Sequence, residues 1–410
     1  MTQNLRINGQ RLWDSLMEMA QIGALPHGGC RRLTLSDEDK QGRDLFIAWC
    51  KAAGCSITID RLGNIFARRP GQDDSRPPVG LGSHLDTQPH GGKFDGVFGV
   101  LAGLEVIRTL NDHNIETATP VEVVSWTNEE GARFAPSMLA SGVFGGEFEL
   151  DYALNRTDAD GFRFGDELER IGYAGDVPVG NHPFTAFFEA HIEQGPVLEA
   201  TNTAIGVVTG VQGFRWYDIT VSGQDAHSGS TPMLNRRDAL LGSADIIKAV
   251  NQIALAHAPD GRGTVGFVRV TPNSRNTIPG QVDFTVDFRH PSHEVLVDME
   301  QRLHAECNQL AAQTGLNIKI DHISYSPPVQ FDAQCIDAAQ NACELLGYTY
   351  RKMISGAGHD ACYISLVAPT SMVFIPCAGG ISHSESESAK PEDLTAGGNV
   401  LLHAVLSFTQ

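Results

Sequence analysis

Residues 79–110, VGLGSHLDTQPHGGKFDGVFGVLAGLEVIRTL, carry the pattern that decides the fold. Residues 79–83 predict a short buried strand, and residues 97–110 have the length and apolar content of a helix. A second strand, Val121–Trp126, follows directly after Pro120. Alternation of strand, helix and strand predicts a mostly parallel sheet covered by helices, and such sheets place their chemistry at the carboxyl ends of the strands.

The same alternating pattern extends to both ends of the chain. Ser36, with Asp39 three residues later, is typical of the N-cap of a helix. The other elements predicted for these parts are helices at 9–22, 37–53, 333–346 and 392–408, a hairpin of strands at 56–60 and 64–68, and a strand at 371–375.

The pattern changes between residues 213 and 329, where strands and helices follow in the order β-α-β-β-α-β that is typical of a ferredoxin-like domain. The predicted elements are strands at 215–222, 263–270, 281–289 and 317–325 and helices at 235–257 and 293–313. We therefore expect an α/β catalytic domain with a mixed, mostly parallel sheet, formed by residues 1–212 and 330–410. An α+β domain at 213–329 would be inserted into it.

Composition limits the class of protein. A chain of 410 residues is long enough for two domains. The net charge of −19 and the lack of a basic run argue against nucleic acid or an anionic membrane as a partner. No run reaches the roughly 18 apolar residues of a membrane span, and the start of the chain does not resemble a secretory signal, so we expect a cytoplasmic protein. The eight cysteines form no C-x₂-C pair, which predicts small buried side chains in a reducing compartment.

Five segments place a His, Asp or Glu just past a predicted strand or beside one. They are GSHLDT at 82–87, GKFDG at 92–96, TNEEG at 127–131, EAHIEQG at 189–195 and GGISHS at 379–384. Taken singly, such a histidine is more often a structural residue and such an acidic pair a solvated turn. Five of them at matching structural positions predict a metal site, and imidazole with carboxylate suits zinc and its neighbours.

These residues resemble a known family over nearly the whole chain. His84-x-Asp86, Asp95-Gly96, the Glu129-Glu130 pair, His191 and His383 are similar to the motifs of the dinuclear zinc family of aminoacylases, dipeptidases and carboxypeptidases. Four longer motifs resemble its ureido-hydrolysing branch, which holds N-carbamoyl-L-amino-acid hydrolases, β-ureidopropionase and allantoate amidohydrolase. They are GKFDGVFG at 92–99, HIEQG at 191–195, DAHSGSTPM at 225–233 and SGAGHDA at 355–361.

The resemblance implies two divalent ions per chain. One would be held by His84, His191 and Asp95, and the other by Glu130, His383 and the same Asp95. A carboxylate is needed at Asp95 because its two oxygens can serve two cations. Zinc is the expected metal, with manganese, cobalt and nickel as alternatives.

The resemblance also implies catalytic roles. Asp86 would fix the imidazole of His84 without being a ligand itself. Glu129, also not a ligand, would take a proton from the attacking water and return it to the leaving nitrogen. A cis peptide bond is implied between Asp95 and Gly96.

Further residues would bind the substrate. His227 would donate to the oxyanion, although a loop histidine facing water is its simpler interpretation. Arg289, at the end of a predicted strand, would clamp a carboxylate with two hydrogen bonds, and Asn276 would join it. Gln194 and the backbone at Gly358 would complete the pocket.

Five further residues have no predicted role in binding. His359 and Asp360 match the SGAGHDA motif without an assigned function. Phe214, Trp216 and Tyr217 are interpreted as packing residues.

The reaction that follows is hydrolysis of an N-carbamoyl amino acid, such as carbamoyl-β-alanine or a carbamoyl-L-α-amino acid, to the amino acid, carbon dioxide and ammonia. Allantoate is the alternative substrate, but the apolar segment at 212–216 favours carbamoyl substrates. The ureido-branch motifs disfavour an N-acyl amino acid or dipeptide, and a non-catalytic metal scaffold would have no use for Glu129. The resemblance implies a homodimer in which the inserted domain acts as a lid, with its residues serving either their own chain's site or the partner's.

Overall fold

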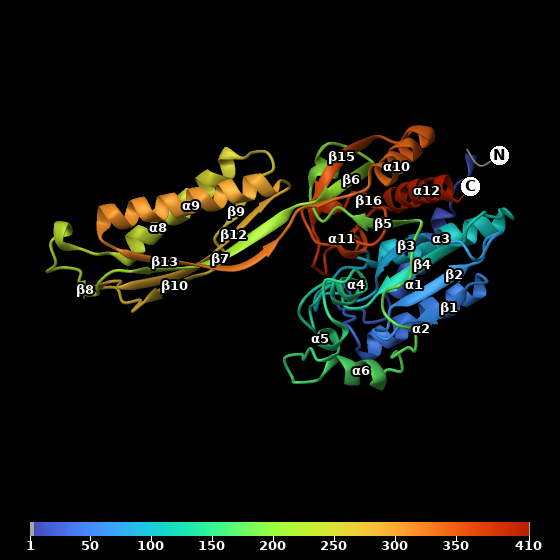
Figure 1. The fold of residues 1–410 in the computed structure, drawn as a ribbon, viewed down its shortest axis with the longest axis horizontal. Helices are drawn as coiled ribbons and strands as arrows, with labels where there is room; N and C mark the ends of the chain where they lie inside the picture. Colours follow the sequence, from blue (N-terminus) through green and yellow to red (C-terminus); the bar gives the residue numbers. More distant parts are fainter. Residues whose placement is uncertain (1–3, 410) are drawn as a thin grey trace. The chain divides into compact units, whose positions relative to one another are not determined.

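The computed structural model describes residues 4–409, which form two units (Figure 1). Unit 1 comprises the chain up to Gly210 together with the chain from Gln330 onward, and unit 2 is Val211–Val329. Unit 1 is therefore discontinuous in sequence, and the chain passes between the units at the ends of β6 (Ile205–Val211) and β14 (Val329–Gln330).

Unit 1 is built on a nine-stranded sheet in the order β1-β2-β4-β3-β5-β16-β6-β14, with β15 also paired to β6. The central pairs β4-β3, β3-β5 and β5-β16 are parallel, and the flanking pairs β1-β2, β2-β4 and β16-β6 are antiparallel. This confirms the predicted α/β class. The strands not yet given are β1 (Ser56–Ile59), β2 (Ile65–Arg69), β3 (Val79–His84), β4 (Val121–Trp126), β5 (Ala186–Ile192), β15 (Tyr350–Ser355) and β16 (Thr370–Ile375).

The central strands are buried along their whole length. Every residue of β3, β4, β5 and β16 is buried, as expected for parallel strands covered on both faces. Gly82 in β3 is needed for close approach, because a Cβ there would lie 2.1 Å from the carbonyl oxygen of Val124 in β4.

Helices cover this sheet. The helices α3, α10 and α12 pack on its central strands, α1 packs on α3 and α12, and α11 contacts β3, β5 and β16. Ser36 caps α2 as predicted, its hydroxyl accepting the Asp39 N–H at 3.2 Å. The helices of unit 1 are α1 (Gly9–Met19), α2 (Asp37–Ala52), α3 (Val97–Asp112), α4 (Leu139–Phe144), α5 (Leu150–Leu154), α6 (Phe164–Arg170), α7 (Val197–Ala200), α10 (Ala333–Leu346), α11 (Asp360–Ile364) and α12 (Pro391–Phe408), with a 3-10 turn at Ala378–Gly380.

Unit 2 has an antiparallel sheet in the order β10-β12-β7-β13, with β9 also paired to β12, and helices α8 and α9 pack on it. This is the order and connection of the predicted ferredoxin-like fold. Alternate residues of β7 and β12 point into the core between sheet and helices. The main elements are β7 (Gly213–Ser222), α8 (Ala239–Ala256), β9 (Arg262–Thr264), β10 (Val268–Thr271), β12 (Gln281–His290), α9 (His293–Thr314) and β13 (Asn317–Ser326). A second, two-stranded sheet pairs β8 (Ala226–His227) with β11 (Thr277–Ile278), and a 3-10 turn lies at Met233–Asn235.

The single strand predicted at 263–270 is two strands. β9 pairs with β12 near Asp287, whereas β10 pairs with it near Phe284. Residues 265–267 connect β9 to β10. No atom lies within 4 Å of the position that a Cβ at Gly266 would take.

Within residues 4–409, α8 is the helix that length and composition alone would allow to cross a membrane. The core helix of a soluble domain meets the same test, and residues such as Ile246, Val250 and Ile253 of α8 lie in the core of unit 2. The cytoplasmic location stays a prediction.

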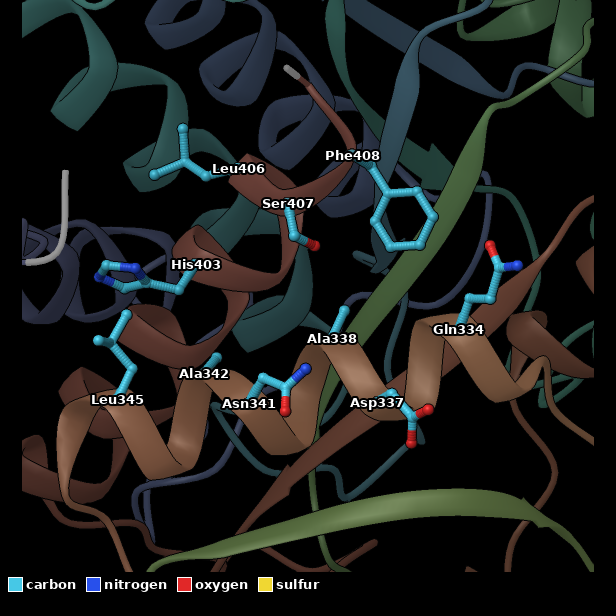
Figure 2. A pocket seen from close by; sticks show the side chains of 10 residues that line it. All are labelled: Gln334, Asp337, Ala338, Asn341, Ala342, Leu345, His403, Leu406, Ser407 and Phe408. Atoms are coloured by element: carbon cyan, nitrogen blue, oxygen red, sulfur yellow. The ribbon is translucent and has the colours of Figure 1, made fainter.

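A groove of about 750 Å³ runs between α10 and α12 (Figure 2). Its lining mixes amides and a carboxylate from α10 with side chains from the last turns of α12. The lining residues are Gln334, Asp337, Ala338, Asn341, Ala342, Leu345, His403, Leu406, Ser407 and Phe408, and the predicted site residues are not among them.

Candidate active site

The predicted metal ligands gather at the carboxyl ends of the parallel strands. His84 is the last residue of β3, His191 the last but one of β5, and Glu130 lies in the turn after β4. His383 lies in the loop after β16, and Asp95 lies just before α3. Because β4, β3, β5 and β16 are neighbours in the sheet, their ends bring these distant residues together.

His84, Asp95 and His191 form a buried group whose ligand atoms all lie within 4.8 Å of one another. Nε2 of His191 is 3.1 Å from Oδ1 of Asp95, and Nε2 of His84 is 3.7 Å from the same oxygen. Both histidines place their Nδ1 atoms against backbone carbonyls, His84 at 2.9 Å and His191 at 3.0 Å, which leaves Nε2 to face the carboxylate.

Asp95, Glu130 and His383 form a second group of ligand atoms within the same distance, in which the His383 side chain is half exposed. Nε2 of His383 is 3.4 Å from Oδ2 of Asp95 and 3.3 Å from Oε2 of Glu130. Asp95 thus turns one oxygen to each group. The two sets of three residues brought together here are the two sets that the resemblance implied.

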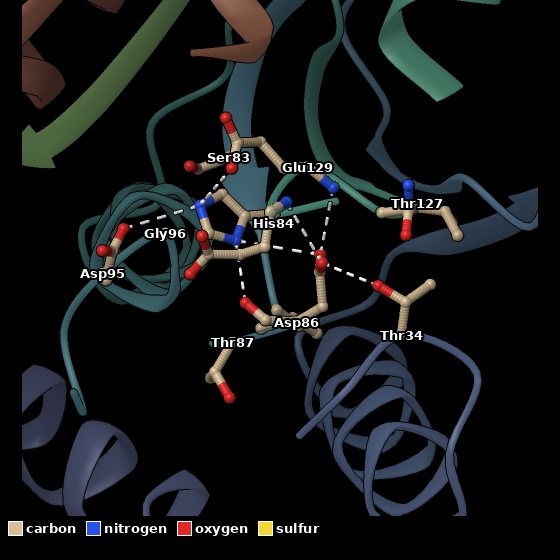
Figure 3. A network of polar contacts seen from close by, with 12 residues as sticks. Thr34, Ser83, His84, Asp86, Thr87, Asp95, Gly96, Thr127 and Glu129 are labelled. Atoms are coloured by element: carbon tan, nitrogen blue, oxygen red, sulfur yellow. Dashed lines mark hydrogen bonds and ion pairs between the residues drawn. The ribbon is translucent and has the colours of Figure 1, made fainter. Parts of the chain in front are cut away.

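Glu129 lies beside these groups and belongs to neither of them (Figure 3). Its Oε2 is 3.5 Å from Nε2 of His84, and its side chain is only 10% exposed. Burial, followed by the nearby carboxylates of Asp360 and Glu130, raises the pKa of Glu129 well above its usual value. A buried carboxyl with a raised pKa beside candidate metal ligands is suited to proton transfer.

Asp86 contacts more than the imidazole that the resemblance assigned to it. It is the backbone carbonyl of Asp86 that lies 2.9 Å from Nδ1 of His84, while the carboxylate is 3.8 Å away. That carboxylate accepts the N–H groups of Glu129 and Glu130, each at 3.3 Å, and the hydroxyl of Thr34 at 2.7 Å (Figure 3). Asp86 therefore also holds the turn that carries the two glutamates.

The expectation of a cis bond between Asp95 and Gly96 is wrong for this structure, since within residues 4–409 every cis peptide bond precedes a proline. The chain turns instead at Gly96 itself, with φ of 68°. In this conformation the Gly96 N–H donates to Nε2 of His191 at 3.1 Å. A Cβ at Gly96 would lie 2.3 Å from the ring of His84, so only glycine fits.

Strained backbone surrounds the site. Asn128, Gln194 and His383 have positive φ values of 63°, 55° and 53°. Such conformations persist for non-glycine residues where their surroundings impose them. The amide of Asn128 donates to the carbonyls of Phe134 and Pro136 at 2.7 and 3.2 Å, which fixes the start of the Glu129–Glu130 turn.

Gln194, predicted to bind substrate, contacts the shared carboxylate directly. Its amide donates to Oδ2 of Asp95 at 2.9 Å and to the hydroxyl of Ser382 at 3.1 Å. Gln88 makes a similar contact with the second group, donating to Oε2 of Glu130 at 2.7 Å. Gln88, Ser382 and Glu387 are not predicted from the sequence. In the sequence SHSESE, the serines and glutamates near His383 match no motif that would indicate a contact with a metal ligand.

The SGAGHDA segment at 355–361 contacts the group formed by His84, Asp95 and His191. The rings of His359 and His191 are 4.5 Å apart, and Nε2 of His359 is 3.0 Å from the hydroxyl of Ser355. Burial and the neighbouring His191 lower the pKa of His359 well below its usual value, so its ring is neutral. Asp360 accepts the Ser141 hydroxyl at 2.5 Å. At Gly358 a Cβ would lie 2.8 Å from the side chain of Met138.

In unit 2, His227 and Asn276 lie together. β8, which carries His227, pairs with β11 directly after Asn276, and the Ser228 N–H donates to the Asn276 carbonyl at 3.0 Å. Nδ1 of His227 accepts the N–H groups of Gly229 and Ser230 at 3.0 and 3.1 Å. The neutral ring then carries its proton on Nε2, which makes Nε2 a hydrogen-bond donor.

Arg289 lies at the other end of the sheet. It bonds to Asp287 at 2.9 Å and lies over the ring of Phe214, 5.7 Å from its centroid. Arg289 is eight positions after Gln281, where β12 begins just past β11, and eight steps span roughly 27 Å at the rise of an antiparallel strand. The structure therefore does not bring Arg289 of one chain together with the His227 and Asn276 of that same chain.

The three aromatic residues of β7 differ from one another. Tyr217 is buried in the core of unit 2, as predicted for a packing residue. Trp216 is 41% exposed and stacks on Phe214 with centroids 4.7 Å apart. Phe214 is the cross-strand neighbour of Arg289, so an aromatic surface borders the guanidinium.

The chain is similar to proteins of a known family. Residues 80–407 match the sequence family described as Peptidase family M20/M25/M40. An N-carbamoyl-L-amino-acid amidohydrolase of Rhizobium meliloti is 51% identical, with 100% of this chain and 98% of that protein covered. An allantoate amidohydrolase of Escherichia coli is 34% identical over 95% of each. A solved amidase of the hydantoinase/carbamoylase family from Burkholderia multivorans superposes with a TM-score of 0.97, at 59% identity over 99% of this chain and 98% of that one.

Proposed function

Since this chain belongs to the peptidase family M20/M25/M40, we propose that it is a metal-dependent amidohydrolase that splits the ureido C–N bond of N-carbamoyl-L-amino acids. The products would be the amino acid, carbon dioxide and ammonia. The observation that carries the proposal is Asp95, which turns one oxygen to each of two ligand groups, with Glu129 as a further carboxylate beside them. The relative that is 51% identical over the whole chain bears the name of this activity.

Two divalent ions, proposed to be zinc, fit the ligand groups. Each group offers imidazole and carboxylate, the donors that zinc accepts, and each contains three side chains, which leaves room for water or substrate. When bound, two cations that share a carboxylate lower the pKa of water and polarise a carbonyl group. Asp86, Gln194 and Gln88 would hold the ligands in place from outside.

Glu129 is proposed as the group that moves the proton. It would accept a proton from the attacking water and deliver it to the nitrogen as the C–N bond breaks. Asp86 keeps Glu129 oriented through the backbone, and the left-handed turn at Asn128 points its side chain toward His84.

Carbamoyl amino acids are preferred over allantoate because of the surroundings of Arg289. A guanidinium can bind a substrate carboxylate with two hydrogen bonds. The stacked rings of Phe214 and Trp216 next to it offer an apolar surface, which suits an apolar side chain better than the second ureido group of allantoate. His227 would donate from Nε2 to the oxyanion, with Asn276 beside it, and the backbone at Gly358 would complete the pocket.

A homodimer explains how both ends of unit 2 can serve in catalysis. A carbamoyl amino acid is far shorter than the roughly 27 Å along β12, so it cannot contact Arg289 and His227 of one chain at the same time. Two copies would supply one residue each. The edge strand β10, with exposed Val268 and the adjacent Phe267, is a surface on which a second copy can pair.

Ammonia release tests the function directly. The metal-loaded enzyme would be supplied with N-carbamoyl-L-α-amino acids, N-carbamoyl-β-alanine, allantoate and N-acetyl amino acids, beside an E129Q preparation as a control for contaminants. We expect the highest kcat/KM with carbamoyl-L-amino acids that carry apolar side chains. Turnover of N-acetyl amino acids alone, or of allantoate in preference to every carbamoyl amino acid, would contradict the proposal.

A further inference from the structure

Glu387 is a buried carboxylate four residues after His383, outside both ligand groups. One of its oxygens, Oε1, accepts the backbone N–H groups of Phe94 and Asp95 at 2.9 and 3.2 Å. The other, Oε2, is 3.2 Å from the hydroxyl of Ser382. Glu387 therefore ties the loop that carries His383 to the segment that carries Asp95.

The connection continues to the carboxylate of Asp95 itself. The Ser382 hydroxyl also lies 2.7 Å from Oδ2 of Asp95, and Gln194 donates to the same oxygen. Glu387 thus holds the backbone of Asp95 directly, and it borders the Ser382 hydroxyl, whose single proton goes to Asp95 by the shorter distance. Because Asp95 must aim one oxygen at each ligand group, a small rotation of its side chain would disturb both groups at once.

Gly92 leaves the space that Glu387 occupies. A Cβ at Gly92 would lie 1.9 Å from the carboxyl carbon of Glu387 and 2.0 Å from its Oε1. Glycine at the first position of the GKFDG segment is therefore required by the carboxylate that fixes the segment's own aspartate.

We propose that Glu387 is a positioning residue of the metal centre, fixing the backbone of Asp95 and bordering the Ser382 hydroxyl that bonds its carboxylate, so that Asp95 serves two ions. A carboxylate that merely fastens a loop would make the two backbone contacts alone. The further contact with the Ser382 hydroxyl, which bonds Oδ2 of Asp95, is what distinguishes Glu387. The inference rests on the proposed metal assignment.

The test is metal affinity of E387D, measured by adding Zn²⁺ to the metal-free enzyme in competition with a chelating dye. Aspartate keeps the charge, but its carboxylate is one methylene too short to reach both the backbone N–H groups and Ser382. We expect binding of both ions to weaken by about 10- to 100-fold, the usual effect of removing a partner of a metal ligand. E387Q, which keeps the length and the acceptor for the two N–H groups, should weaken binding less than E387D.

The matched control is E385D, the same change two residues earlier. Glu385 bonds to His90, an exposed residue, and E385D should bind Zn²⁺ like the wild type. Melting of the metal-free proteins checks that each variant folds. If E387D does not fold, G92A replaces it, because the added methyl group displaces the Glu387 carboxylate without changing Glu387.

The outcomes are separable. Native Zn²⁺ affinity in folded E387D or G92A, or an equal loss in E385D, would overturn the role of Glu387. Wild-type enzyme that binds no second ion would overturn the metal assignment itself, and the inference with it.

Discussion

Glu129 and Glu130 are adjacent carboxylates with different surroundings. Glu130 faces His383 and Asp95, whereas Glu129 faces His84 from outside the two ligand groups. In E129Q we expect both ions to remain while kcat falls by about 10²- to 10⁴-fold, the usual contribution of a general base. Metal analysis beside steady-state kinetics checks this, with E130Q as the comparison that should lose metal. Loss of metal from E129Q would mean that the two roles are exchanged.

Asp95 is the residue on which both ligand groups depend. D95A removes a carboxylate from each group, so we expect both ions to be lost together and activity to be abolished. Elemental analysis of the purified variant, with D166A as a control on an exposed ion pair of Arg163, measures this. One tightly retained ion with substantial turnover would exclude the shared carboxylate.

The sequence predicts these residues because each candidate ligand lies in a short local motif. It does not predict the contacts of Asp86, because the carboxylate reaches the Glu129–Glu130 turn only when β3 and β4 lie side by side. Glu387 escapes prediction for the same reason, since its partners are nearly three hundred residues away in the chain.

The helix α2 contacts the start of the turn that carries Glu129 and Glu130. Its buried Arg43 bonds to Asp39 at 2.8 Å and to the Thr127 hydroxyl at 3.2 Å, where the Glu129–Glu130 turn begins. R43M leaves the buried Asp39 without its cation, and we expect the free energy of unfolding to fall by about 3–5 kcal/mol. K40M removes an exposed ion pair with Asp44 in the same helix and should cost at most about 1 kcal/mol. Denaturant unfolding of both variants tests the contrast, which equal losses would refute.

Secondary structure was predicted well where one periodicity runs unbroken. The predicted bounds of Val121–Trp126 and Ala333–Leu346 agree with β4 and α10. The segment at 263–270 was misjudged because the register against β12 changes within it, and a register is set by the partner strand. The short helices α4 to α7 lack the length that makes a helical period visible.

Arg289 is the test of substrate recognition by the whole molecule. R289K keeps the charge but loses the two-pronged geometry, so we expect a loss of about 1.5–3 kcal/mol, or roughly 10- to 150-fold in kcat/KM. An analogue without the carboxylate should be a poor substrate for the native enzyme. Its kcat/KM should be nearly the same with R289K as with the native enzyme. Equal losses for analogue and substrate would make Arg289 a structural residue.

Mixing two inactive variants tests the shared site in a homodimer. H227A lacks the proposed oxyanion donor and E129Q lacks the proposed base, so each alone should be nearly inactive. If His227 acts in the partner's site, a mixed dimer contains one complete site, and we expect partial recovery of ammonia release after subunit exchange. No recovery in a confirmed mixed dimer would place both residues in the same chain's site.

The interruption of unit 1 by unit 2 has a consequence for the order of synthesis on the ribosome. Unit 2 is one continuous segment and can fold as soon as it has emerged. Unit 1 cannot, because β16 lies between β5 and β6 in its sheet and is translated after all of unit 2. His383 emerges later still. The first part of unit 1 therefore stays incomplete until β16 has been translated. A chain that stops before Thr370 would contain a complete unit 2 but no complete metal centre.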